Sequence, residues 1–172
     1  MVAATVCVAA GVGTGCSGGG FSPAASGGGG DHPLIGAQTP DFDLKAQYGG
    51  QRASLAAAAG KIVIVDFWAT WCDPCRDSFP HYQAMLDRHA GELVVLGVST
   101  DEDPSGIAKF GKQTGVKFPL AWDDGQSVSR QYSPSTMPTS YIIGKNGIVR
   151  YVHPGFRSGD EAELEENVSA LK

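Results

Sequence analysis

The chain has 172 residues, of which 42% are hydrophobic and 18% charged, and its formal net charge is −5. This length and composition predict one domain with a single sizeable core. The chain has no basic stretch, which argues against a nucleic-acid-binding protein.

The first 36 residues are interpreted as an export signal followed by a flexible linker. Residues 2–12 form an apolar run that fits the core of a signal peptide and is too short to span a bilayer. The stretch "SGGGFSPAASGGGGDHP" that follows is rich in Gly, Ser and Pro, as flexible linkers are. Residues 1–36 are therefore assigned to export and tethering, and residues 37–172 to the folded domain.

Cys16 is the candidate attachment point of a lipid anchor. It ends "GTGC", which resembles the cleavage box of bacterial lipoproteins, in which the cysteine becomes the lipidated first residue. Gly13 stands where that box usually has leucine, and no Lys or Arg precedes Lys45. The alternative is cleavage near Ala24 or Ala25, which would release a soluble protein.

The folded part begins with short elements and then a longer unit. "PDFDL" and "QRASL" around "YGG" predict a strand pair, and "LAAAAG" predicts a short helix ended by Gly60. "KIVIVDFW" is typical of a strand buried on both faces of an α/β sheet. Helical spacing follows over 75–90, where Pro80 is expected to kink the helix, and "ELVVLGVST" predicts another buried strand. The unit 61–99 is therefore strand–helix–strand, with parallel pairing.

The second half continues the α/β pattern. "PSGIAKFGKQTG" predicts a helix, "FPLAW" a short strand and "SVSRQY" one or two helical turns. "TSYIIGKNGIVRYVH" predicts a hairpin whose turn contains Asn146 and Gly147, a pair suited to positive φ. The segment "SGDEAELEENVSALK" predicts a closing helix, which Ser158 or Asp160 is expected to cap.

Cys72 and Cys75, separated by Asp73 and Pro74, form the candidate redox site. Cys72 is expected where a buried strand meets a helix N-terminus, and the unpaired amides and helix dipole there favour a thiolate. Cys75 lies one turn deeper on the same face, so the pair can open and close as a dithiol/disulfide couple. We expect Cys72 to attack and Cys75 to resolve, and Pro74 to occupy an early helical position.

Two structural roles for the cysteine pair are disfavoured. A zinc site needs about four ligands, and the chain has no second Cys-x-x-Cys, while Cys7 and Cys16 lie in the export segment. A permanent bridge across so short a loop would add little stability. A Cys-x-x-Cys beside a βαβ pattern instead indicates redox chemistry, with no metal and no cofactor.

Asp66 is the third candidate catalytic residue. A carboxylate alone in "IVIVDFW" is expected to be desolvated, which raises its pKa. Such a group can relay a proton to or from Cys75. The alternative is an Asp at the frayed edge of the strand, which would have no part in the reaction.

The segment "VDFWATWCDPCR" resembles the active-site segment of the thioredoxin superfamily. "FWATWC.PCR" is especially similar to the membrane-anchored TlpA/ResA-like thiol–disulfide oxidoreductases of bacterial envelopes, and the resemblance runs from about Gly36 to the C-terminus. It implies a thioredoxin fold with a central mixed sheet flanked by helices, an N-terminal β-hairpin extension and a central insertion. It also implies a redox role in the bacterial cell envelope. The expected partners are disulfide-containing envelope proteins and a membrane electron donor of the thiol-relay type.

The same resemblance supplies a substrate-binding surface. Pro138 in "TMPT" matches the family's cis-proline, and the Met137 backbone should face Cys72 and pair with an extended substrate segment. Trp71 is expected to shield the disulfide from water. Trp71, Pro74, Met137 and Pro138 are therefore the candidate substrate-binding residues.

The chain departs from the family pattern at two positions, and it lacks the motifs of two rival functions. Ser78 stands where several ResA-like relatives carry a glutamate, and Thr139 stands where cytochrome c maturation members tend to carry an acid. Both departures argue against a specialised cytochrome role. A peroxiredoxin-like peroxidase would need the motif Pro-x-x-x-Thr-x-x-Cys, which is absent. A metallochaperone-type binding module would need a longer cysteine spacing and an added histidine.

Overall fold

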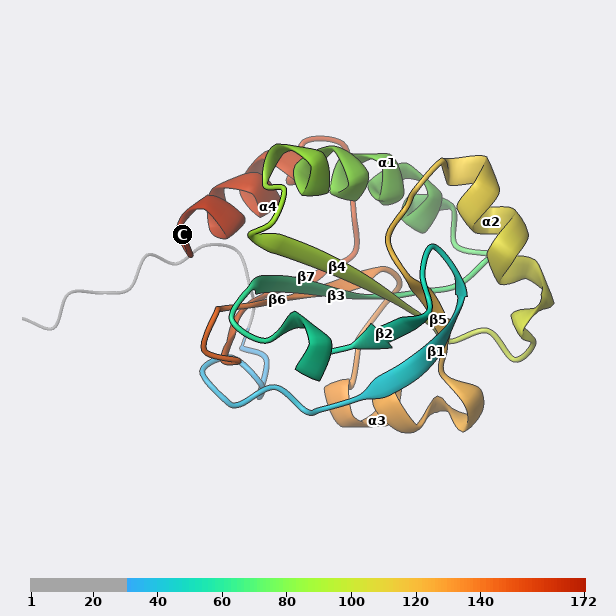
Figure 1. The fold of residues 1–172 in the computed structure, drawn as a ribbon, viewed down its shortest axis with the longest axis horizontal. Helices are drawn as coiled ribbons and strands as arrows, with labels where there is room; N and C mark the ends of the chain where they lie inside the picture. The colour runs from blue at the N-terminus through green and yellow to red at the C-terminus, as the bar shows by residue number, and fades with distance from the viewer. Residues whose placement is uncertain (1–30) are drawn as a thin grey trace, which may run out of the picture.

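The computed structural model, which describes residues 31–172, is built around one mixed sheet of seven strands (Figure 1). The strands are β1 (Asp43–Tyr48), β2 (Arg52–Ser54), β3 (Ile62–Trp68), β4 (Leu93–Ser99), β5 (Leu120–Trp122), β6 (Thr139–Ile143) and β7 (Val149–Pro154). Their order across the sheet is β2-β1-β5-β4-β3-β6-β7. The central strands β5, β4 and β3 are parallel, and antiparallel pairs flank them on both sides.

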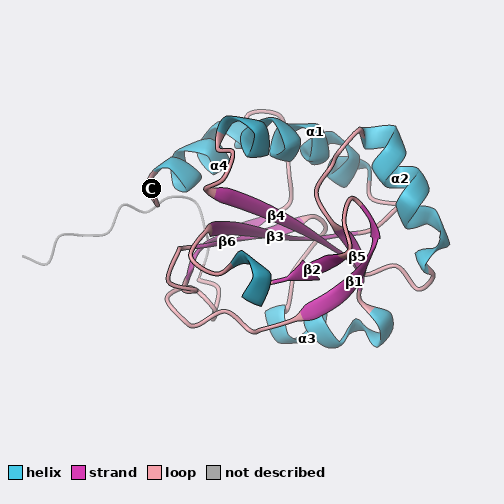
Figure 2. Ribbon diagram, viewed as in Figure 1, coloured by secondary structure: helices cyan, strands magenta, loops and turns pink. Residues whose placement is uncertain are grey.

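Helices cover both faces of this sheet (Figure 2). They are α1 (Asp73–Arg88), α2 (Ile107–Thr114), α3 (Ser127–Tyr132) and α4 (Asp160–Ser169). Short 3₁₀ turns lie at Ala56–Ala58, Pro104–Gly106 and Asp124–Gln126. Figure 1 shows α1, α2 and α4 on one face and α3 on the other. Among the helices of residues 31–172, none has the length and apolar character needed to cross a membrane.

Strand β3 is the centre of the core, and all seven of its residues are buried. Because side chains alternate along a strand, Ile62, Ile64 and Trp68 belong to the core cluster under α1, where they pack with Phe79. Residues 63, 65 and 67 belong to the cluster on the α3 face. The prediction of a strand buried on both faces is confirmed, and the same alternation turns Asp66 towards α1.

The predicted strand–helix–strand unit is also confirmed, since β3 and β4 pair in parallel around α1. Pro80 lies inside α1, and the helix continues past it to Arg88. The segment predicted as a short helix forms only the 3₁₀ turn Ala56–Ala58, and Gly60 follows with a φ of 79°. The β6–β7 hairpin is present.

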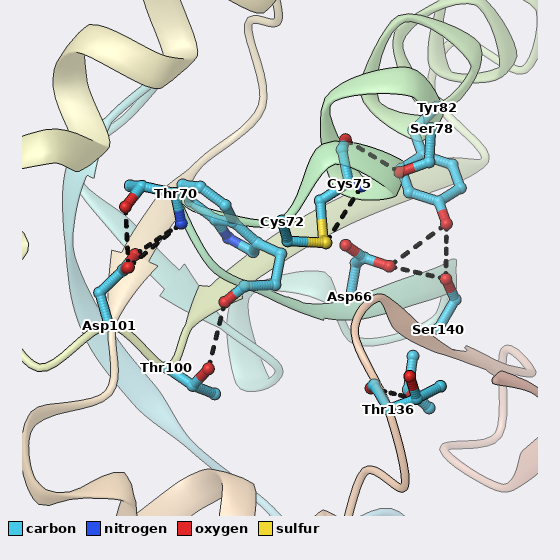
Figure 3. Close-up of a disulfide and its surroundings, with 12 residues drawn as sticks. Asp66, Thr70, Cys72, Cys75, Ser78, Tyr82, Thr100, Asp101, Thr136 and Ser140 are labelled. Carbon is cyan, nitrogen blue, oxygen red and sulfur yellow. Dashed lines mark hydrogen bonds between the residues drawn. A yellow bond between two sulfur atoms is a disulfide. The ribbon is translucent and has the colours of Figure 1, made fainter. Parts of the chain in front are cut away.

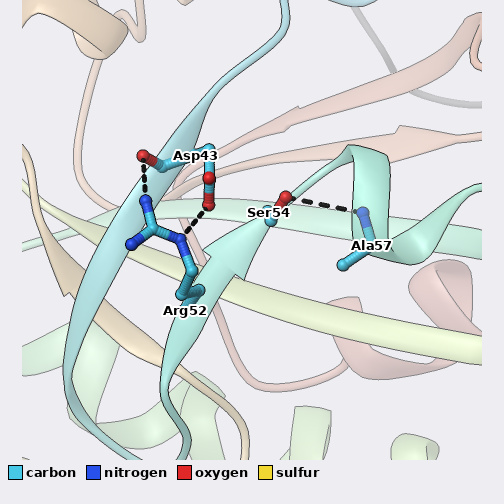
Figure 4. Close-up of polar contacts among 4 residues, drawn as sticks. All are labelled: Asp43, Arg52, Ser54 and Ala57. Carbon is cyan, nitrogen blue, oxygen red and sulfur yellow. Dashed lines mark hydrogen bonds and ion pairs between the residues drawn. The ribbon is translucent and has the colours of Figure 1, made fainter.

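The N-terminal strand pair lies at one edge of the sheet, and Figure 4 shows its polar contacts. The Arg52 Nε donates to Asp43 Oδ1 at 2.5 Å across the pair, and both side chains are about half exposed. Ser54 Oγ accepts from the Ala57 amide at 3.4 Å, which links β2 to the 3₁₀ turn. An exposed ion pair of this kind adds little stability.

The prediction that Ser158 or Asp160 caps the last helix is wrong. The residue that precedes α4 is Gly159, with a φ of 106°, and no side chain caps the helix. Asp160 is already the first helical residue, and its carboxylate accepts from the Arg157 amide at 2.8 Å, outside the helix. Glycine occupies this position because a left-handed backbone is unfavourable for a residue with a side chain, such as serine. The proposed lipidation site Cys16 and the alternative cleavage positions lie outside the described residues.

Candidate active site

The two cysteines lie where β3 passes into α1, and they are joined by a disulfide (Figure 3). Cys72 is the N-cap of α1, and its Sγ accepts a hydrogen bond from the Cys75 amide at 3.2 Å. Pro74 occupies the first turn of the helix, where its missing amide leaves no bond unmade. The sequence therefore placed both sulfurs and the proline in their correct local positions.

The two sulfurs differ in access to solvent. Cys72 is 5% exposed, whereas Cys75 is fully buried. The amide at 3.2 Å is also directed at the Cys72 sulfur, and a donor at that distance stabilises a thiolate. Both observations favour Cys72 as the attacking group and Cys75 as the resolving group.

We expect mild alkylation of the reduced protein to label Cys72 at least about tenfold faster than Cys75, because a hydrogen bond to the thiolate increases its population. Peptide mapping after a short exposure to the reagent would measure the ratio. The same reagent in denaturant provides the control, since both cysteines should then react alike. Preferential labelling of Cys75 in the folded protein would reverse the assignment.

Asp66 is completely buried in the middle of the sheet, under α1. It pairs with Gly97 of β4 on one side and Ser140 of β6 on the other, so the alternative of a frayed strand end is wrong. Its Oδ1 accepts from Ser140 Oγ at 2.7 Å and from Tyr82 Oη at 3.2 Å, while Oδ2 has no hydrogen-bond partner among residues 31–172.

The environment of Asp66 brings its pKa close to neutral. Burial raises the pKa of this carboxyl to about 7, and the hydrogen bonds from Ser140 and Tyr82 only partly oppose that rise. Figure 3 shows the carboxyl beside the disulfide. A carboxyl with a pKa near 7 can both accept and donate a proton under physiological conditions.

The loop before β6 contains the predicted cis-proline. The Met137–Pro138 peptide bond is cis, as expected. Met137 is half-buried and packs against the core cluster that contains both cysteines. The Thr139 Oγ1 donates to the Thr136 carbonyl at 2.7 Å, and the Gly155 amide donates to the Pro138 carbonyl at 2.7 Å. These bonds hold the loop in place at the start of β6.

Trp71 precedes Cys72 and is 72% exposed. A ring that faces solvent to this extent is available to contact a partner, whereas Trp68 lies fully inside the core. Exposed tryptophans of this kind are common in binding surfaces because they combine a large apolar area with a polar edge. The shielding role expected for Trp71 stays a prediction.

Behind the active-site loop lies a polar clamp that was not predicted from the sequence. Asp101, which is 7% exposed, accepts from the Thr70 amide at 3.0 and 3.1 Å and from Thr70 Oγ1 at 2.8 Å. The Ser99 hydroxyl donates to the same carboxylate at 2.7 Å. The clamp therefore joins the loop before Cys72 to the end of β4. The only available signal was an Asp shortly after a predicted buried strand.

Ser78, one of the departures noted above, is fully buried in α1. Its hydroxyl donates to the Cys75 carbonyl at 3.1 Å, so it is satisfied within the helix. A buried serine at this place adds no charge near the sulfurs. Asp66 is then the buried carboxyl beside the cysteine pair.

Comparison with known proteins agrees with this geometry. The AhpC/TSA family model matches residues 35–152, a range that contains both cysteines, Asp66 and the cis-proline. The thioredoxin-like protein YneN of Bacillus subtilis is 33% identical over 131 residues, covering 74% of this chain and 76% of YneN. The thiol-disulfide oxidoreductase ResA of Geobacillus kaustophilus is 31% identical over 142 residues, covering 80% of this chain and 78% of ResA.

Solved structures show the same fold. A crystal structure from Chlorobium tepidum, described as thiol:disulfide interchange protein DsbE, superimposes with a TM-score of 0.75 at 36% identity. The match covers 80% of this chain and 96% of that chain. The expected thioredoxin fold is therefore confirmed.

Proposed function

Because the chain belongs to the AhpC/TSA family and is a thiol–disulfide oxidoreductase of the ResA/DsbE type, we propose that it reduces disulfides of envelope proteins outside the cytoplasm. The observation that carries the proposal is the Cys72–Cys75 disulfide at the start of α1, with the Asp66 carboxyl buried beside it. This arrangement supplies a nucleophile, a resolving thiol and a proton acceptor in one place.

The reaction uses the dithiol form of the pair. The Cys72 thiolate attacks a substrate disulfide and forms a mixed disulfide, releasing one substrate sulfur as a thiolate. Cys75 then attacks Cys72 Sγ, which frees the second substrate sulfur and closes the Cys72–Cys75 bond. Two electrons pass from the protein to the substrate, and a membrane donor of the thiol-relay type restores the dithiol.

The substrate-binding surface is proposed to consist of Trp71, Pro74, Met137 and Pro138. The exposure of Trp71 and the packing of Met137 against the cysteine cluster support it. An extended substrate segment would pair with the backbone at Met137, which recognises main-chain groups and tolerates varied sequences.

The cellular location rests on the sequence of residues 1–36. The apolar run and the Gly/Ser/Pro-rich stretch after it support export, with residues 37–172 as the catalytic domain and Cys16 as a lipid anchor. Mass spectrometry of the protein purified from membranes distinguishes a lipidated Cys16 from cleavage near Ala24 or Ala25.

The proposal is tested by trapping. In Cys75→Ser the mixed disulfide with Cys72 cannot be resolved by the protein itself, so substrates should accumulate as adducts. We expect adducts with envelope proteins that disappear when reductant is added. The control is the double variant with Cys72→Ser as well, which should form none.

Two outcomes would contradict the proposal. Adducts with cytosolic proteins alone, or none beyond the control, would rule out envelope proteins as substrates. The direction of electron transfer is checked by acid-quenched alkylation of the wild-type protein in cells. If the protein is a reductant, its cysteine pair should be mainly in the dithiol form. A pair that is mainly oxidised at steady state would indicate the opposite direction.

A further inference from the structure

Three buried oxygen atoms form a triangle next to the disulfide (Figure 3). Tyr82 Oη lies 2.6 Å from Ser140 Oγ, Ser140 Oγ lies 2.7 Å from Asp66 Oδ1, and Tyr82 Oη lies 3.2 Å from the same Oδ1. All three side chains are fully buried, which removes them from bulk solvent. The polar atoms therefore depend on one another.

Counting protons gives the direction of the hydrogen bonds. The Tyr82 and Ser140 hydroxyls carry one proton each. When Asp66 is ionised, two protons are therefore available for the three contacts. Ser140 Oγ donates to Asp66 Oδ1, and the Tyr82 hydroxyl shares its proton between Ser140 Oγ and, at the longer distance, Asp66 Oδ1. The 3.2 Å contact is then the weakest side of the triangle.

This arrangement leaves the two carboxyl oxygens of Asp66 unequal. Oδ1 is engaged by the hydroxyls of α1 and β6, while Oδ2 is buried without a partner in the part of the chain that the structure describes. A buried carboxyl oxygen without a donor is costly, so its retention calls for an explanation. In Figure 3 the oxygen that makes no hydrogen bond lies on the side of the sulfurs.

We propose that Tyr82 and Ser140 are positioning residues of the exchange reaction. Their hydroxyls hold Oδ1 and orient the carboxyl, so that Oδ2 is the atom that exchanges a proton with Cys75. This inference rests on the proposed role of Asp66 as the proton relay, and it assigns that role to one atom.

The closing reaction starts from the mixed disulfide between Cys72 and the substrate. With a substrate sulfur bonded to Cys72, the Cys75 S–H gives its proton to Asp66 Oδ2, and the resulting thiolate attacks Cys72 Sγ. The bond between Cys72 and the substrate breaks, and the substrate leaves with the electron pair as a thiolate. In the opening reaction the protonated Oδ2 returns a proton to the departing Cys75 thiolate.

The surroundings of Asp66 bring the pKa of this buried carboxyl to about 7. From α1 it faces Tyr82, whose pKa burial raises well above its ordinary value, and the cysteine pair. Gly97 on β4 has no side chain. On β7, His153 is the cross-strand neighbour of Ser140, but its Nε2 is engaged with Asn167 and burial lowers its pKa.

Ser140→Ala and Tyr82→Phe test the inference through a pH profile. Reduced protein is mixed with a chromogenic aromatic disulfide, and the second release of aromatic thiol reports the attack by Cys75. Removing a donor from an ionised carboxylate raises its pKa, so the Ser140→Ala midpoint should move up by about one pH unit. Tyr82→Phe removes the more distant donor and should move it upward by less.

The matched control is Tyr141→Phe. Tyr141 follows Ser140 in β6 and is also fully buried, but its hydroxyl donates to the Tyr132 carbonyl at 2.7 Å on the other face of the sheet. Its loss removes one buried hydroxyl without touching Asp66, so the midpoint should stay in place. Ser140→Thr keeps the hydroxyl and should restore the wild-type midpoint.

The outcomes separate this inference from the function on which it rests. If Asp66→Asn abolishes the pH dependence but Ser140→Ala and Tyr82→Phe leave the midpoint unchanged, the relay stands and the positioning role is wrong. If Asp66→Asn itself leaves the pH dependence unchanged, the relay is wrong. A Tyr141→Phe shift equal to that of Ser140→Ala would show a general packing effect and also overturn the inference.

Discussion

Asp66→Asn is expected to raise the free energy of unfolding of the oxidised protein at pH 8 by about 4 kcal/mol. Burial raises the pKa of Asp66 from an ordinary 3.8 to about 7. Each pKa unit corresponds to about 1.4 kcal/mol, and at pH 8 the folded wild-type protein must hold an ionised carboxylate in its core. The asparagine amide is neutral at every pH and occupies nearly the same volume as the carboxyl.

The sign of the pH dependence follows from proton binding. Between pH 3.8 and about 7 the folded state binds more protons at Asp66 than the unfolded state does. The contribution of Asp66 to stability is therefore fully present below pH 3.8 and is lost as the pH rises through 7. The wild-type protein should lose stability over that window relative to Asp66→Asn.

Urea unfolding of the disulfide-intact chain at pH 4, 6 and 8 would measure this difference. Asp77→Asn makes the same chemical change at an exposed position of α1 and should alter stability by less than about 0.5 kcal/mol. Wild type and Asp66→Asn curves that run parallel across the pH range would show that Asp66 does not carry the raised pKa.

The same substitution is expected to slow resolution of the mixed disulfide about 100-fold at pH 8. A positioned general base contributes roughly 10²- to 10⁴-fold, and the amide cannot accept the Cys75 proton. Wild-type resolution should accelerate as the pH rises through 7, because Asp66 must be ionised to act as the base. In Asp66→Asn that acceleration should disappear.

Stopped-flow measurement of thiol release between pH 6 and 8 checks this expectation. Asp77→Asn again serves as the control, because it removes an exposed carboxylate from the same helix without altering the buried site. Equal rates for wild type and Asp66→Asn throughout this range would show that another group, or water, takes the proton.

Together the two results would describe a residue that weakens the fold and accelerates the reaction. Burying a carboxyl with one oxygen unpartnered is destabilising once it ionises. Active sites are places where such a cost is tolerated, because the perturbed pKa is needed for the chemistry. A single substitution that stabilises the protein and impairs exchange would be the signature of that arrangement.

Most of the fold could be predicted because its signals are short in range. The apolar run of β3, the helical spacing of α1 and the turn before β7 each depend on a few neighbouring residues. The cap of α4 was missed because Ser158 and Asp160 both suit the role chemically. The backbone conformation at Gly159, with its φ of 106°, decided the question.

The sequence by itself determined the chemistry of the cysteine pair, because everything it needs lies within one turn of helix. Cys72, Pro74 and Cys75 follow a buried strand, and the helix N-terminus that activates the first sulfur begins there. A solitary carboxylate in an apolar strand likewise predicted a raised pKa for Asp66. These are local consequences of chain order and burial.

Only the tertiary structure decided what surrounds that carboxyl. Ser140 is 74 residues away from Asp66 and reaches it because β6 pairs with β3, while Tyr82 reaches it because α1 crosses the same face. Thr70 and Asp101 are 31 residues apart and meet because β3 and β4 are neighbouring parallel strands. Hydrogen bonds of this kind depend on strand order and register, which no short stretch of sequence specifies.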